Sequence, residues 1–120
     1  MTAVADAAAA LATALATVDG IRVSTDPATS IDLATAIIGP PSLTWEAFAQ
    51  APTTAFFPIY LVLTNTDSVV DELWALLEPI TAAIDAAELE ASVQRADPGT
   101  FNAGGTELPS YEIQIEVSLQ

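Results

Sequence analysis

The chain has 120 residues, 52% of them hydrophobic, and a formal net charge of -14 at pH 7. Its 16 acidic residues face only two cations, Arg22 and Arg95, which argues against nucleic-acid binding because that binding needs Lys and Arg to neutralise phosphates. The chain contains no Cys and no His, which excludes disulfides, the common zinc sites and a nucleophile activated by an imidazole base.

The apolar fraction predicts one folded domain over residues 1–120 instead of a disordered chain. It exceeds the usual share of roughly 45–50%, which hints at contacts between subunits. No signal-peptide pattern and no run of ~18 apolar residues is apparent, so we expect a soluble, intracellularly made protein without a membrane partner.

The N-terminal segment predicts a helix over residues 2–18. Its apolar residues recur at helical spacing and would form one face: Val4, Ala8, Leu11, Leu15 and Val18. Gly20 suits the left-handed cap that would end this helix.

Two strands are predicted next, at residues 21–24 and 31–38, with a turn at 26–27 between them. Gly39-Pro40-Pro41 bounds the second strand, because prolines cannot continue a hydrogen-bonded ladder. Residues 43–50 then read as a loop that Trp45 and Phe48 would anchor in the protein.

The most hydrophobic stretch, residues 54–64, predicts a strand that is apolar, and therefore covered, on both faces. Pro58 lacks an N–H group, so an edge, a bulge or a gap in the ladder is expected beside it.

Residues 65–68 look like the cap of a second helix, with Asp71 and Glu72 at the positive end of its dipole. The apolar stripe of this helix would be Val70, Leu73, Leu77, Ile80, Ile84 and Ala87. Pro79 removes a bond to the carbonyl of Ala75, so we expect one continuous helix kinked at that point.

The last third predicts strands at residues 89–96 and 109–120, because apolar and polar side chains alternate there. Between them, residues 97–99 read as a turn and 101–108 as an exposed loop. The fold class is therefore α/β (α+β), with two helices packed on a small mixed or antiparallel sheet in the order α-β-β-β-α-β-β.

Carboxylates recur in three groups: Asp71 with Glu72, Asp85 with Glu88 and Glu90, and Glu112 with Glu116. Paired carboxylates can hydrolyse glycosides or bind Ca²⁺, but none of these groups has the spacing of a Ca²⁺ loop. Helix capping and a solvated strand face explain them more simply. Gly104-Gly105 lacks the spacing and the Lys of a phosphate-binding loop, so no metal or other cofactor is expected.

Arg22 and Arg95 would each pair with a carboxylate, within one subunit or across an interface. Four aromatic residues could line a ligand site, although ordinary core packing is the simpler explanation: Trp45, Phe48, Phe56 and Phe57.

Several short segments, in order along nearly the whole chain, together resemble those of one known family. The first half has a helix leading into Asp19-Gly20-Ile21-Arg22-Val23, the turn Ile38-Gly39-Pro40-Pro41 and a strand at 56–63. The second half has a helix around Asp71-Glu72-Leu73-Trp74, then Val93-Gln94-Arg95, Phe101, Gly104-Gly105 and Leu108-Pro109-Ser110-Tyr111. In these features the chain resembles the tail terminator (minor tail, tail-to-head joining) proteins of long-tailed bacteriophages, particularly those infecting actinobacteria.

The resemblance implies a non-enzymatic virion protein, made in the host cytoplasm and located at the neck of the tail. Six copies would form a ring that ends polymerisation of the tail tube protein and meets a head-completion or stopper protein, while DNA passes through the lumen without specific binding. Candidate subunit-interface residues are Arg22, Arg95, Phe56 and Tyr60. Candidate acidic residues facing the lumen or the neck are Asp67, Asp71, Glu72, Glu112 and Glu116.

Other functions remain open at this point. The chain could be another ring-forming head–tail connector or neck component, or a tail-tube subunit. More remotely, it could be a small-ligand carrier or an acidic hydrolase that uses Glu112 and Glu116.

Overall fold

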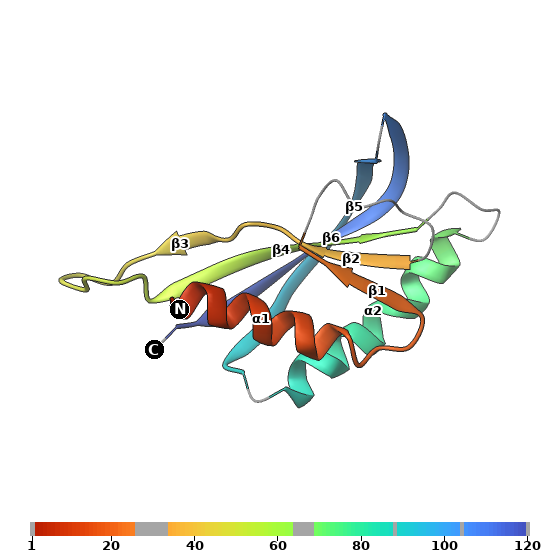
Figure 1. The fold of residues 1–120 in the computed structure, drawn as a ribbon. Helices are drawn as coiled ribbons and strands as arrows, with labels where there is room; N and C mark the ends of the chain where they lie inside the picture. The colour runs from red at the N-terminus through yellow and green to blue at the C-terminus, as the bar shows by residue number, and fades with distance from the viewer. Residues whose placement is uncertain (1, 26–33, 64–68, 88, 104, 120) are drawn as a thin grey trace.

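The computed structural model describes residues 2–25, 34–63, 69–87, 89–103 and 105–119, and in it two helices pack on one mixed sheet (Figure 1). The helices are α1 (Ala3–Leu15) and α2 (Val69–Ala86). The strands are β1 (Ile21–Ser24), β2 (Ala34–Ile38), β3 (Ser42–Thr44), β4 (Thr54–Val62), β5 (Ala91–Ala103) and β6 (Thr106–Ser118). The predicted α+β class and element order are confirmed, with β3 as a short additional strand where a loop was expected.

The strands of the described residues form one sheet in the order β1-β2-β4-β6-β5, and β3 also pairs with β4. β1 runs parallel to β2, and every other pair is antiparallel. β4 is therefore the central strand, and β5 lies at an edge of the sheet.

α1 begins as its sequence dictates. The Thr2 hydroxyl accepts a hydrogen bond from the N–H of Ala5 at 3.0 Å, which satisfies one of the donors left unpaired at a helix start. The helix buries Ala7, Leu11, Ala14 and Leu15, and Gly20 has the left-handed φ of +87° expected after its end.

Both helices cover the same face of the sheet. The main core joins Leu11 and Leu15 of α1 and Ile80 and Ile84 of α2 to side chains of the central strands, all fully buried. The strand residues in this core include Phe57, Ile59, Leu61, Ile113 and Ile115. The predicted covering of β4 on its other face is found only at one end, where Val62 is fully buried together with Ile37 and Leu108. Along the rest of that face Phe56, Pro58 and Tyr60 remain half-exposed.

α2 runs through Pro79 as a single helix, so the predicted continuity is confirmed, while the kink at this point stays a prediction. Its buried stripe begins at Val69 and continues with Leu73, Ile80 and Ile84. Val70, which the stripe was predicted to include, is instead 48% exposed, because the helix meets the sheet one residue earlier.

Pro58 lies in the middle of β4, and the partner strand is irregular beside it. From Ile38 to Ser42 the chain advances four residues while β4 advances only three, from Ile59 to Phe56, so the intervening segment is a bulge. Gly39 donates its N–H to the Pro58 carbonyl at 2.8 Å, and Pro58 has no N–H to return. The predicted interruption of the ladder is therefore confirmed.

The β5–β6 hairpin is much longer than predicted. Residues 97–99, expected as a turn, and residues 101–103 and 106–108, expected as loop, all belong to strands. Pro98 and Gly99 are tolerated because β5 is an edge strand, where a missing N–H can face outward.

The predicted turn at 26–27, residues 31–33 of the predicted second strand and the predicted helix cap at 65–68 lie outside the described residues. Among the described residues, no helix has the length and apolar character needed to cross a membrane.

Candidate functional site: the open face of the sheet

The face of the sheet opposite α1 and α2 carries most of the residues that the sequence singled out. Directly paired strand residues share a face, so the register extends this face from Arg22 of β1 across to Arg95 of β5. We call it the open face. Its predicted site residues are Arg22, Phe56, Tyr60, Arg95, Glu112 and Glu116.

A polar row crosses the open face at Glu112. Tyr60 of β4 and Asp97 of β5 are the direct partners of Glu112 on its two sides. Burial raises the pKa of the Tyr60 phenol, and the charge of Glu112 together with a hydrogen bond to it raises this pKa further. Tyr60 and Glu112 are therefore in direct contact on one surface, although Tyr60 was predicted at the subunit interface and Glu112 at the lumen or neck.

Arg95 is engaged within its own strand. Its Nε lies 2.7 Å from Asp97 Oδ2, and its guanidinium also donates to Asp97 Oδ1 at 3.0 Å. Hydrogen bonding to Asp97, and then the charge of Asp97, raise the pKa of Arg95, to which Glu112 adds a smaller charge effect. This is the intrasubunit pairing that the sequence left open for Arg95.

A bulge in β5 brings an extra polar side chain to the open face. The register shifts between Val93 and Arg95, so Gln94 has no partner in β6 and bends the strand. Its side-chain amide donates to Glu116 Oε2 at 3.0 Å and to the Ser92 hydroxyl at 2.8 Å. Glu116 is thereby held in place by β5.

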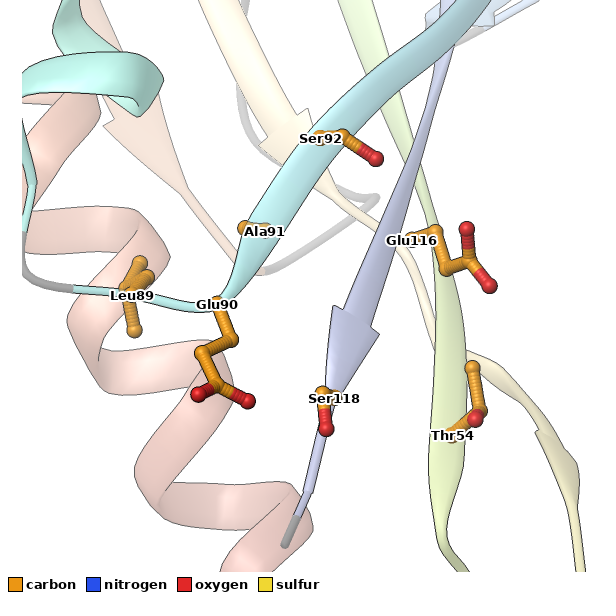
Figure 2. Close-up of a pocket in the computed structure, with 7 residues that line it drawn as sticks. All are labelled: Thr54, Leu89, Glu90, Ala91, Ser92, Glu116 and Ser118. Carbon is orange, nitrogen blue, oxygen red and sulfur yellow. The ribbon is translucent and has the colours of Figure 1, made fainter.

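Beside Glu116 the surface forms an open hollow of about 370 Å³ (Figure 2). It is lined by Thr54, Leu89, Glu90, Ala91, Ser92, Glu116 and Ser118. Figure 2 shows the Glu116 carboxylate pointing away from Glu90, so the two carboxylates do not converge on one point. The described residues contain no group of three or more side chains suited to holding a metal ion.

The geometry gives little support to a hydrolase that uses Glu112 and Glu116. Their Cα atoms are four residues apart on one strand, roughly 13 Å at about 3.3 Å per residue. Glycosidase carboxyl groups are roughly 5–10 Å apart and aim at one bond. Here each carboxylate instead faces a different neighbour, Tyr60 or Gln94.

The remaining predicted acidic residues lie elsewhere. Asp71 and Glu72 are exposed in the first turn of α2, in the helix layer and away from the open face. Asp67 lies outside the described residues, as does Glu88 of the second carboxylate group. The predicted acidic set is therefore divided between the two layers.

The aromatic residues are not gathered into one cluster. Phe57 is buried under the helices at 1% exposure, and Phe56 lies on the open face. Trp45 and Phe48, predicted as anchors, are 54% and 104% exposed. The aromatic contact in the described structure is instead between Tyr60 and Phe101, whose ring centroids are 5.8 Å apart. Gly104-Gly105 led to the prediction of an exposed loop at Phe101, but Phe101 belongs to β5 and pairs with Leu108 of β6 across the hairpin.

No protein-family model matches this chain, and no curated protein matches it. The geometry of the open face and the charge of the chain therefore carry the functional argument.

Proposed function

We propose that this protein is a structural subunit of a long-tailed phage, which caps the tail tube as a ring of six copies. In this role it ends tube polymerisation and offers its other side to the head-completion proteins. This role requires surfaces that bind identical neighbouring copies, and it does not require a catalytic centre.

The observation that supports it best is the one-sided layering of the fold. α1 and α2 both cover one face of the sheet (Figure 1), while Phe56, Pro58 and Tyr60 remain half-exposed on the open face. A sheet face with partly exposed apolar residues is a typical contact surface for another protein chain. The choice of a ring of six copies on a tail tube comes from the resemblance in sequence to tail terminators.

The charge of the chain is compatible with DNA passing through such a ring. Phosphate binding depends on Lys and Arg, and the chain has two cations against 16 acidic residues. Arg95 is also engaged by Asp97 on the open face, beside Glu112. A ring built from such a chain would offer few contacts to passing phosphates.

A tube-extension assay tests the proposal. Purified protein is added to growing tubes of tail-tube protein from a long-tailed actinobacteriophage, and tube lengths are measured by electron microscopy. We expect tube growth to stop after the protein is added, and we expect to see the protein bound at one end of each tube. Unchanged tube growth with no protein at the ends, over a series of such tube proteins, would show that the chain has a different function.

A further inference from the structure

Residues 42–53 form an arm that projects from one end of the sheet, the yellow segment at the left of Figure 1. Its root is fixed by Thr53, which is 5% exposed. Thr53 donates its N–H to the Thr44 carbonyl at 2.9 Å, and its hydroxyl accepts from the N–H of Glu46 at 3.2 Å. The Thr53 carbonyl accepts from the N–H of Leu119 at 3.0 Å, so the arm has a defined direction.

The outer part of the arm presents two aromatic side chains to solvent. Trp45 is 54% exposed and Phe48 is 104% exposed. Phe48 also has a φ of +68°, a region that bulky residues rarely adopt. The positive φ belongs to a turn that the Ala49 N–H closes by donating to the Glu46 carbonyl at 3.1 Å. Packing within one chain leaves the ring in solvent, and burial by another molecule would remove it from water.

An apolar hollow of matching character lies on the open face, which we call the Tyr60 hollow. Its volume is about 380 Å³, and the Tyr60 and Phe101 rings meet there at 47°. Its lining includes Ile37, Tyr60, Thr100 and Phe101, and none of its lining residues is charged.

The arm cannot fill the hollow of its own chain. β4 begins at the arm and reaches Tyr60 six residues later, roughly 20 Å away at about 3.3 Å per residue. The arm also points away from the sheet (Figure 1). A second copy in a similar orientation can bring its arm to the hollow, which is a head-to-tail contact able to close into a ring.

The distribution of charge favours a second copy as the occupant. Two chains of net charge -14 repel each other, so a stable contact must keep carboxylates apart. The arm carries one charged residue, Glu46, and the Tyr60 hollow carries none. These two surfaces can meet with few acidic side chains near the contact, namely Glu46 of the arm and Glu112 beside Tyr60.

We infer that Phe48 and Trp45 of one copy insert into the Tyr60 hollow of the next copy. The closure of this contact into a ring of six rests on the proposed function. The contact between the arm of one copy and the Tyr60 hollow of another does not depend on the number of copies in the ring, and it is tested by itself.

Cysteine cross-linking tests the contact, because the chain has no cysteine of its own. A Phe48→Cys protein is mixed with a Thr100→Cys protein under mild oxidation, in solution at high concentration and on tail tubes. The matched control replaces Thr100→Cys with Thr13→Cys, another exposed threonine, which lines a groove between α1 and α2. We expect a disulfide-linked heterodimer with Thr100→Cys and none with Thr13→Cys.

Cross-linking of Phe48→Cys to Thr13→Cys with equal yield, or absence of the Thr100→Cys product in both settings, would overturn the contact. A Phe48→Cys protein that couples mainly to itself would also overturn it, because the arms would then meet around a twofold axis. If rings form on tubes but the Phe48→Cys and Thr100→Cys proteins do not cross-link, the arm–hollow contact is refuted and the proposed function stands. If the two proteins cross-link in solution but the tubes remain uncapped, the proposed function is refuted and the arm–hollow contact stands.

Two further substitutions measure the strength of the contact. Phe48→Gly removes the ring and suits the positive φ, so it leaves the fold intact. We expect it to weaken association by about 10- to 100-fold, the effect of losing one buried aromatic side chain. Trp45→Ala should also weaken association, whereas Trp74→Ala, which removes an equally exposed tryptophan from α2, should not. Unchanged sedimentation of the Phe48→Gly protein over the same concentrations would contradict the inference.

Discussion

Gly39 and Pro58 together explain how a proline can lie in the central strand of the sheet. Pro58 has no N–H, and because the partner strand bulges at this point, no regular ladder bond to that N–H is required. Gly39 still donates its N–H to the Pro58 carbonyl. A Cβ added at Gly39 would lie 2.9 Å from Pro58 Cγ and 3.2 Å from Tyr60 Cε2. Glycine is therefore required here by close approach of the rings opposite.

Replacing Gly39 with alanine should lower the free energy of unfolding by about 1–3 kcal/mol, the usual cost of overpacking. The stiff proline ring cannot move aside easily, so the strand must shift. Gly99→Ala is the control, because a Cβ at Gly99 meets nothing within 4 Å and should change stability by less than about 0.5 kcal/mol. Urea denaturation of both variants measures the difference, and equal midpoints would contradict the account.

Tyr60 should make stability depend on alkaline pH. Its pKa is raised from 10.0 by burial and by Glu112, so the folded state holds the phenol proton more tightly than the unfolded state. The stabilisation is complete below pH 10 and is lost as pH rises through the raised pKa. We therefore expect the stability advantage of the native protein over Tyr60→Phe to shrink above pH 10.

Denaturation of the native and Tyr60→Phe proteins from pH 8 to 11.5 provides the measurement. Tyr111→Phe serves as the control, since it removes the other tyrosine and keeps the Tyr60–Glu112 pair. A constant difference between native and Tyr60→Phe proteins across this range would show that Glu112 and burial do not act on Tyr60.

At the scale of elements, periodic segments could be read from the sequence where local pattern and tertiary contacts agree. β1 matches its predicted range, and the alternation of β6 correctly placed Glu112 and Glu116 on one face. Pro98 and Gly99 misled because they are typical turn residues, yet an edge strand paired along its length with β6 accommodates them. The turn residues alone did not show how far the β5–β6 hairpin extends.

The candidate site was predictable only in part, for the same reason. The contact of Tyr60 with Glu112 depends on the register of β4 against β6, and the position of Arg95 depends on a bulge at Gln94. Neither feature leaves a local signal in the sequence. The exposure of Phe48 could not be inferred either, because aromatic residues are more often buried and only the projecting arm leaves this one in solvent.

Pro79 is the weak point of α2. It cannot donate to the carbonyl of Ala75, although the helix continues on both sides and both residues are exposed to solvent. Pro79→Ala should restore this bond and raise the free energy of unfolding by about 1–3 kcal/mol. Glu78→Ala, an exposed neighbour, is the control, and thermal unfolding of both variants is the measurement. A less stable Pro79→Ala protein would mean that the fold requires the proline.

At the scale of the whole molecule, the excess of acidic residues should prevent binding to DNA. With a net charge of -14, the protein repels phosphates at distances near the Debye length, about 8 Å at physiological salt. We expect no retardation of duplex DNA by the purified protein at low or physiological salt, with a basic DNA-binding protein as the positive control. Binding that weakens steeply as salt rises would contradict a role as a passive wall.

The most direct test of the central claim, that identical copies form a ring at the tube end, is the symmetry of the assembled protein. Averaged electron micrographs of tail-tube ends incubated with the protein provide it. Our account predicts one ring of six copies at a single end, with the arm of each copy against the next. A twofold dimer that persists alone, with no ring on any tube, would contradict it.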